Sequence, residues 1–203
     1  MPKELGGKDG GNLAMAVIRE HLATKGLGLH NDLQNEHSIV GNNVGVLLMA
    51  EYGSAEQKEE WLPLMLEGKR GFAFGITEPA HGSDATHMET NAVRDGDGWK
   101  INGAKTWNTG IHKAQYDMVM ARTSGKAGDG DGITAFLTPL DAEGAKIEEF
   151  LWTFNMPTDH GTVSFKDVYV DNSAIFGEEG HGLQIVQHFF NENRIRQAAS
   201  SLG

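Results

Sequence analysis

The chain contains no cysteine among its 203 residues. Disulfide bonds and thiolate chemistry are therefore excluded, which fits an intracellular protein. The first residues, Met1–Glu4, lack the apolar core of a secretory signal peptide, and nothing near them is rich in arginine and poor in acid like a mitochondrial transit peptide. We therefore expect a cytoplasmic location, or the mitochondrial matrix if the source is a eukaryote.

Long apolar runs and an excess of positive charge are also missing. The longest apolar run, Val44–Ala50, is far shorter than the roughly 20 residues that span a bilayer, so we expect no membrane span. Lysine and arginine total 17 against 28 aspartates and glutamates, a formal net charge of −11. That balance argues against a nucleic-acid-binding protein. An anionic cofactor or substrate must then be held by local donors against the overall field.

Metal-binding patterns are absent from the sequence as well. The chain has no H-E-x-x-H motif, and its nine histidines are scattered, at positions 21, 30, 37, 81, 87, 112, 160, 181 and 188. The glycine- and aspartate-rich segment Gly125–Gly132 lacks the terminal glutamate of an EF-hand and the strand–turn–helix setting of a dinucleotide fingerprint. We interpret it as a solvated loop, with a calcium loop as the weaker alternative, and expect no metal site.

The first third of the sequence has helical periodicity. Before Gly26 and Gly28, apolar residues recur at helical spacing and predict one buried face, made of Ala14, Val17, Ile18 and Leu22. A second helix is expected over Ser38–Tyr52. Ser54 and Gln57 form a capping box that begins a third helix. The apolar stripe of that helix consists of Trp61, Leu62, Met65 and Leu66.

From Gly71 the pattern changes to short strands, with Asn102-Gly103 interpreted as a two-residue turn. The predicted strands are Phe72–Ile76, Asn91–Arg94, Trp99–Ile101, Lys105–Trp107, Tyr116–Ala121, Ile133–Leu137 and Val163–Val170. From Gly182 the helical period returns and predicts a long buried helix, with an apolar face of Leu183, Ile185, Val186, Phe189, Phe190, Ile195 and Ala198. This order indicates an α+β fold with separate domains, over residues 1–70, 71–177 and 178–203.

The segment Gly75–Asp84 is the most informative stretch of the sequence. It places small, hydroxyl and acidic residues around two glycines at the end of an apolar, strand-like run. A loop of this composition can bring backbone N–H groups and short hydroxyls close to a phosphate or to a flat polar ring.

Four ordered motifs resemble those of the acyl-CoA dehydrogenases. Gly75–Asp84 is similar to the first, although His81 and His87 stand where small residues are usual in that family. Ile101–Thr109 resembles the second, Asn-Gly-x-Lys-x-Trp-(Ile/Asn)-Thr. Val163–Val170 resembles the strand Val-x-Phe-x-Asp-Val-x-Val. The last is carried by Gly180–Leu183 with Asn193-Arg194. The resemblance covers nearly the whole chain.

The resemblance implies a fold, a cofactor and partners. The fold would have N-terminal helices, a middle antiparallel β-barrel or sandwich, and the start of a C-terminal helical bundle, truncated relative to the family. The cofactor would be FAD and the substrate an acyl-CoA thioester. The expected partners are an electron-transfer flavoprotein and further subunits, in a homo- or hetero-oligomer.

The resemblance also assigns site residues. The flavin ring would face the backbone of Phe74, Gly75, Ile76 and Thr77 and the Thr77 hydroxyl. Ser83 would contact the diphosphate or the thioester arm, and Trp107, Asn108 and Thr109 would complete the flavin contacts. Core packing for Trp107 and a turn role for Thr109 are the bland alternatives. Asn191 and Arg194 would lie near the CoA portion, although Arg194 could be a plain surface residue and Arg196 could take its place.

The reaction implied is removal of the α-proton by a glutamate while a hydride leaves the β-carbon for flavin N5. No such glutamate can be identified here. The family's usual base lies in a C-terminal region outside this sequence, and the position used by a minority of relatives is Asn193. Glu192 is one residue away, about 100° around a helix, and is not expected to be the base.

Two alternatives remain open at this point. The chain could be a non-catalytic partner subunit or a degenerate fragment of the same fold. It could also belong to a sister flavoenzyme, such as a nitroalkane oxidase or a flavin-dependent hydroxylase. The acyl chain length and the electron acceptor are not encoded in any pattern that we can identify.

Overall fold

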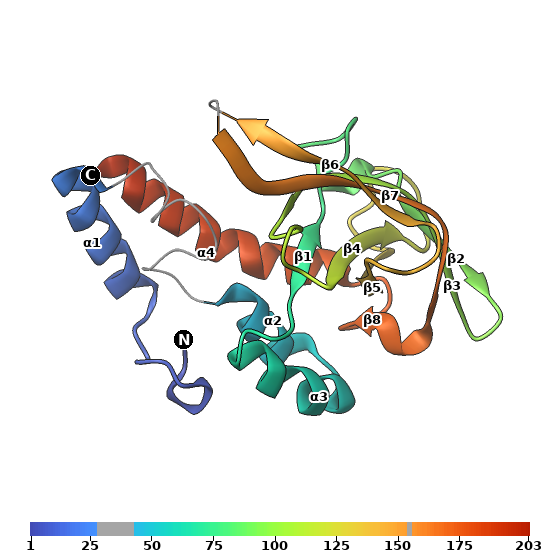
Figure 1. The fold of residues 1–203 in the computed structure, drawn as a ribbon, viewed down its shortest axis with the longest axis horizontal. Coiled ribbons are helices and arrows are strands. Elements are labelled where there is room, and N and C mark those ends of the chain that lie inside the picture. Colours follow the sequence, from blue (N-terminus) through green and yellow to red (C-terminus); the bar gives the residue numbers. More distant parts are fainter. Residues whose placement is uncertain (28–42, 154–155) are drawn as a thin grey trace.

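The computed structural model describes residues 1–27, 43–153 and 156–203, and places helices on one side of a large sheet (Figure 1). The helices are α1 (Asn12–Leu22), α2 (Val44–Tyr52), α3 (Ala55–Leu66) and α4 (Gly182–Leu202), with short turns η1 (Lys3–Leu5), η2 (Ala23–Leu27), η3 (Ala85–His87) and η4 (Asn172–Ala174). The strands are β1 (Phe72–Gly75), β2 (Asn91–Asp95), β3 (Gly98–Thr109), β4 (Tyr116–Arg122), β5 (Ile133–Pro139), β6 (Ala145–Thr153), β7 (Met156–Asp171) and β8 (Ile175–Phe176). The predicted α+β class is confirmed.

Two of the helices, α2 and α3, begin at side-chain caps. Asn43 caps α2 by accepting a hydrogen bond from Val46 N, and the capping box of Ser54 and Gln57 is present at the start of α3. The Gln57 amide also donates to the carbonyls of Ser173 and Ile175, at 2.8 and 2.9 Å, which ties α3 to the β-domain. Gly28 and the predicted helical residues 38–42 lie outside the described part of the chain.

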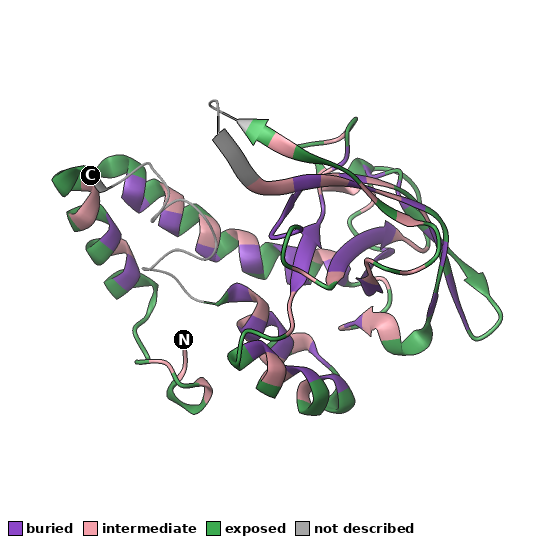
Figure 2. Cartoon of the chain, viewed as in Figure 1, coloured by how far each residue is buried: buried purple, intermediate pink, exposed green. Residues whose placement is uncertain are grey.

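The predicted apolar face of α1 is wrong. The helix buries Met15 and Arg19, whereas Val17 and Ile18 are 56% and 48% exposed. Figure 2 shows that exposed positions cover much of α1. Its neighbour is α4, and there Arg19 Nε donates to Ser200 Oγ at 2.9 Å and to the carbonyl of Arg196 at 3.3 Å. The face of α1 that is buried therefore depends on the polar groups of α4 that bind Arg19. The apolar periodicity of α1 does not contain that information.

Helix α4 changes character half-way along its length. Its first half buries Ile185, Val186 and Phe189, as predicted. Beyond these the buried face consists of Glu192, Arg196, Ala199 and Ser200, while the predicted Ile195 and Ala198 are exposed. The first half packs on the sheet and the second half packs on α1. The apolar residues of α4 therefore face the sheet, and its buried polar residues face α1.

The strands form one sheet in the order β6-β7-β3-β1-β4-β5-β8, with β2 paired to β3 and β4. Pairing is antiparallel except between β1 and β4 and at the single pair Asn91–Arg122. Strand β6 was not predicted. One hydrophobic cluster lies between the sheet and helices α2 to α4, and a second lies within the β-domain around Trp99, Val119, Phe136 and Val168. These two clusters fix the end of β1, where the candidate site begins.

The predicted Asn102-Gly103 turn is wrong, because both residues lie inside the continuous strand β3. The pairing of β3 with β7 shifts at this point, and Gly103 has φ 147°. Asn102 Nδ2 donates to Asp167 Oδ1 at 3.0 Å, and Asp167 N donates back to Asn102 Oδ1 at 2.9 Å. Because Asn102 bonds to Asp167 on the neighbouring strand, the Asn-Gly pair, which is typical of hairpin turns, forms a β-bulge here. No described helix is long and apolar enough to cross a membrane.

Candidate functional site

Two of the motif segments meet at the end of β1. Phe74 pairs with Thr109 of β3, and Thr106 N donates to the carbonyl of Thr77 at 2.9 Å. The loop that leaves β1 is closed by reciprocal backbone bonds between Glu78 and His81, at 3.0 and 3.2 Å. Residues about 30 positions apart are thus held against one another by backbone pairing, as neighbouring strands of a sheet require.

A buried ion pair lies beneath this junction. Lys105 Nζ is 2.8 Å from Glu78 Oε1 and 3.2 Å from the carbonyl oxygen of Ile76, and its side chain has no exposed surface. The Glu78 carboxylate also accepts from Glu89 N at 2.6 Å and Thr90 N at 2.9 Å. Three positive or N–H donors therefore converge on one buried carboxylate.

The ion pair perturbs both of its members. Burial lowers the pKa of Lys105, an effect that the neighbouring carboxylates oppose. For Glu78, burial works to raise the pKa, but the Lys105 ammonium and the donors from Thr90 and Glu89 together lower it. Glu78 is therefore ionised, and its role in the loop is structural.

The loop leaves polar groups open above the ion pair. Within the described residues, neither the backbone N–H nor the hydroxyl of Thr77 or Ser83 makes a hydrogen bond. Thr77 is half-buried and Ser83 is exposed. Four donors from two small residues are therefore available to a polar ring or a phosphate, which is the kind of donor set that a flavin diphosphate requires.

Trp107 follows Thr106 on β3, the residue whose N–H donates to the Thr77 carbonyl. It has φ 62° and its side chain is 48% exposed, which does not fit a core-packing role. Its ring meets the His160 ring edge-on with centroids 6.3 Å apart. The hydroxyl of Thr109, which is nearly buried, is 3.2 Å from His160 Nε2. Trp107 thus presents an aromatic face to solvent at the edge of the site.

Three of the predicted flavin residues have side chains or Cα atoms engaged inside the protein. The Phe74 ring stacks on Phe189 with centroids 4.7 Å apart. Asn108 is buried and its Nδ2 donates to Asp117 Oδ2. A Cβ added to Gly75 would lie 2.8 Å from that carboxylate. Any contact of these residues with a ligand would therefore be made by their backbone.

The predicted substrate residues lie on α4. Arg194 Nη1 donates to Asn191 Oδ1 at 3.2 Å, and its guanidinium lies 5.5 Å from the centre of the Phe190 ring. Asn191 lines a groove of about 800 Å³ together with Gln184 and Gln187. Both Asn191 and Arg194 are exposed. Arg196 cannot take the place of Arg194, because its side chain is buried beside Glu192 and Asn193.

The glycine-rich segment Gly125–Gly132 joins the two parts of the site. Within the described residues, the Arg122 guanidinium donates only to backbone carbonyls, those of Thr86, Ser124, Asp129 and Asp131. Gly128 N donates to the carbonyl of Thr86 at 3.0 Å, and Gly130 lines the groove on α4. Among the described residues, no group of three or more acidic or histidine side chains could hold a metal ion.

Two family models match most of the chain. Residues 1–69 match the N-terminal domain of acyl-CoA dehydrogenases, and residues 73–168 match their middle domain. The chain belongs to the acyl-CoA dehydrogenase family. The family implies a flavin cofactor. The open donors of Thr77 and Ser83 and the exposed face of Trp107 fit such a group.

Individual family members match between 94% and 100% of the chain. The human mitochondrial short-chain specific acyl-CoA dehydrogenase is 32% identical over 206 residues, which cover 100% of this chain and 48% of that protein. A probable acyl-CoA dehydrogenase from Mycobacterium abscessus superimposes with a TM-score of 0.81 at 26% identity, over 98% of this chain and 52% of that one. The ChsE4–ChsE5 complex of Mycobacterium tuberculosis superimposes with a TM-score of 0.73 at 29% identity, over 94% and 47%. The chain spans about half the length of these relatives.

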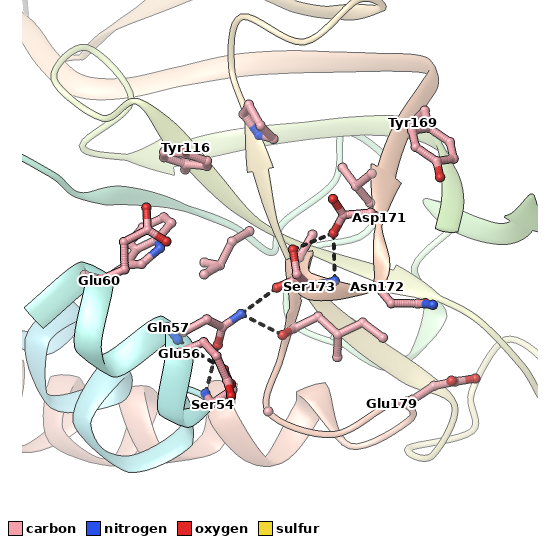
Figure 3. Close-up of a pocket in the computed structure, with 17 residues that line it drawn as sticks. Ser54, Glu56, Gln57, Glu60, Tyr116, Tyr169, Asp171, Asn172, Ser173 and Glu179 are labelled. Atoms are coloured by element: carbon pink, nitrogen blue, oxygen red, sulfur yellow. Dashed lines mark hydrogen bonds between the residues drawn. The ribbon is translucent and has the colours of Figure 1, made fainter. Parts of the chain in front are cut away.

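A second cavity, of about 880 Å³, is lined by α3 and by the end of β7, including Tyr169 and Val170 of the Val163–Val170 motif (Figure 3). Its lining includes residues of α3 and β8 and the acidic residues Glu56, Glu60, Asp171 and Glu179. Two of these are already neutralised, since Arg70 pairs with Glu60 and Arg94 with Glu179. The predicted flavin and substrate residues, all of which lie in the described ranges, do not line it.

Proposed function

We propose that this chain carries the flavin-facing part of an FAD-dependent acyl-CoA dehydrogenase, which oxidises the α,β carbon–carbon bond of an acyl-CoA thioester. The observation that carries the proposal is the meeting of the Gly75–Asp84 loop with the Trp107 end of β3, joined by the bond from Thr106 N to Thr77 O. The domain division at residues 70/71 and 177/178 forms part of the proposal.

In this proposal the open groups of the site hold the cofactor. When bound, the flavin supplies an acceptor for the hydride that leaves the β-carbon. The N–H and hydroxyl of Thr77 would donate to the ring edge, with the backbone of Gly75 and Ile76 beside them. Donors placed there favour the added electron density of the reduced ring without reorganisation. Ser83 would bind the diphosphate or the thioester arm, and Trp107 would pack on the ring.

The substrate would approach along α4. Asn191 and Arg194 are proposed to bind the CoA portion, since an exposed guanidinium pairs well with phosphate and the carboxamide offers both a donor and an acceptor. The groove beside them, lined by Gln184 and Gln187, offers further amides. The local positive charge of Arg194 offsets the net charge of −11 at this place.

The α-proton acceptor is proposed to be a glutamate outside these 203 residues. Glu192 is a poor candidate, because its Oε1 lies 3.7 Å from Arg196 Nε on the buried side of α4. Asn193 cannot accept the proton as a carboxylate can. Another segment or another chain would then complete the site. A homo- or hetero-oligomer and an electron-transfer flavoprotein as acceptor remain predictions, as does the cytoplasmic or mitochondrial location.

Trp107→Ala is expected to raise the dissociation constant for FAD about tenfold, equivalent to roughly 1.4 kcal/mol of lost aromatic packing. The measurement is a titration of FAD followed by its fluorescence. Trp152→Ala is the matched control, because Trp152 is also exposed, at 65%. Trp99 would be a poor control, since it is 2% exposed and its loss would damage the core. Equal weakening by the Trp107 and Trp152 variants would contradict the assignment.

Arg194→Ala is expected to weaken the binding of a CoA thioester about tenfold, because a charge-assisted hydrogen bond is worth roughly 1.5–3 kcal/mol. Isothermal titration with an acyl-CoA measures the effect. Lys113→Ala removes the same charge from an exposed position remote in sequence from α4 and serves as the control. An unchanged affinity in the Arg194 variant would show that Arg194 is a surface residue without a role in CoA binding.

A further inference from the structure

A buried polar pair lies under the proposed flavin strand. Asn108 of β3 and Asp117 of β4 have no exposed surface, and Asn108 Nδ2 donates to Asp117 Oδ2. A Cβ on Gly75 of β1 would lie 2.8 and 2.9 Å from the two Asp117 oxygens, so the glycine is in direct contact with the carboxyl. The pair therefore sits where three strands converge and where β1 passes into the loop.

This pair lacks one donor. Within the described chain, Asp117 Oδ1 and Asn108 Oδ1 are both buried without a hydrogen-bond partner. An ionised carboxylate and an amide oxygen are both acceptors, so neither can satisfy the other. A proton on Asp117 Oδ1 would turn that atom into a donor, so that one of the two unmatched acceptors is removed.

The surrounding charges also favour the neutral acid. The charged groups that face Asp117 are Lys105 and, through it, Glu78, and these two already balance one another at 2.8 Å. The paired residues on the neighbouring strands, Ala73 of β1 and Thr138 of β5, carry no charge. An ionised Asp117 would thus add an unbalanced buried negative charge. Burial raises the pKa of Asp117 to about 7, although Lys105 and Asn108 act to lower it.

We propose that Asn108 and Asp117 are positioning residues for the strand end Gly75–Thr77, and that Asp117 performs this role as a neutral acid. The link is Lys105, whose ammonium donates to the carbonyl of Ile76. An ionised Asp117 competes for that ammonium and weakens its hold on the Ile76 carbonyl. The neutral form is present below the pKa of Asp117, about 7, and is lost above it. The strand end is therefore ordered at the lower pH.

The first test needs no cofactor. Amide NMR shifts of Gly75, Ile76 and Thr77 are followed from about pH 5 to 9, a range that brackets one titration. In the unmodified chain they are expected to titrate with a midpoint near 7, the pKa of Asp117. Asp117→Asn should flatten the curves, whereas the exposed-site control Asp141→Asn should leave them unchanged. A Gly75 titration that survives in Asp117→Asn, or none in the unmodified chain, would overturn the proposal.

The second test connects the pair with FAD and rests on the proposed function. The dissociation constant for FAD should rise about tenfold between acidic and alkaline pH, the effect of one pKa unit of coupling. Asp117→Asn should abolish that slope. Equal slopes in both proteins would reject the positioning role. A chain that binds no FAD at any pH, yet shows the Gly75 titration, would reject the flavin function and leave the positioning of the strand end intact.

Discussion

Lys105→Met is expected to lower the free energy of unfolding by about 3–5 kcal/mol, the usual cost of removing one partner from a buried ion pair. The variant leaves the Glu78 carboxylate inside the protein without its ammonium and leaves the Ile76 carbonyl without its donor. Denaturant unfolding followed by circular dichroism measures the loss. The effect on the candidate site follows directly, because both orphaned groups belong to the Gly75–Asp84 loop.

Lys100→Met is the matched control for this prediction. Lys100 lies on the same strand and pairs with Asp95 at 3.0 Å, but both side chains are nearly half exposed. An exposed pair of this kind contributes about 0–1 kcal/mol. The double variant Glu78→Gln with Lys105→Met should recover part of the lost stability, since no unpaired charge stays buried. Similar losses in the Lys105 and Lys100 variants would refute the importance of the buried pair.

Gly103→Ala is expected to destabilise the chain by about 3–5 kcal/mol, the sum of backbone strain and overpacking. Gly103 has φ 147°, a conformation that side chains with a Cβ rarely adopt. A Cβ at this position would lie 2.4 Å from Thr90 Oγ1 and 2.7 Å from Thr90 Cα. Because Thr90 N also donates to Glu78, the clash reaches the buried ion pair. Thermal unfolding measures the effect.

Gly96→Ala is the control that distinguishes backbone strain from a steric clash of the added Cβ. Gly96 also has a positive φ, 59°, but nothing lies within 4 Å of an added Cβ. Its substitution should therefore cost only the strain of a left-handed residue, about 1–2 kcal/mol. If the Gly103 and Gly96 variants lose stability equally, contact with Thr90 does not limit this position.

The elements that the sequence predicts well are those with local signals. The capping box at Ser54 and the strands Tyr116–Arg122 and Ile133–Pro139 are each specified by residues within the element itself. Strand β6 was missed because Lys146, Glu148 and Glu149 interrupt its alternation. It forms because β7 pairs with it, from Ala145 opposite Phe165 to Thr153 opposite Met156, and this pairing is not visible in the residues of β6 alone.

The candidate site divides in the same way. The motif residues Thr77, Ser83 and Trp107 could be named from the resemblance of their segments to the family motifs. The residues that hold those segments in place could not be named from the sequence. Lys105 and Glu78 appear in the motifs as separate letters, and only the folded chain brings them to 2.8 Å. Asp117 belongs to no motif, and its contact with Gly75 depends on the parallel pairing of β1 and β4.

The Arg122 guanidinium donates to four main-chain carbonyls, and this has a consequence for how the sequence of the glycine-rich loop can vary. A loop held through its carbonyls can exchange exposed side chains, such as that of Lys126, without losing its anchor. The loop loses its conformational entropy when the chain folds, so ligand binding does not have to order it. Arg122 thus fixes the backbone conformation of the loop whatever its exposed side chains are. Those side chains can change in sequence while the loop continues to line the groove beside α4.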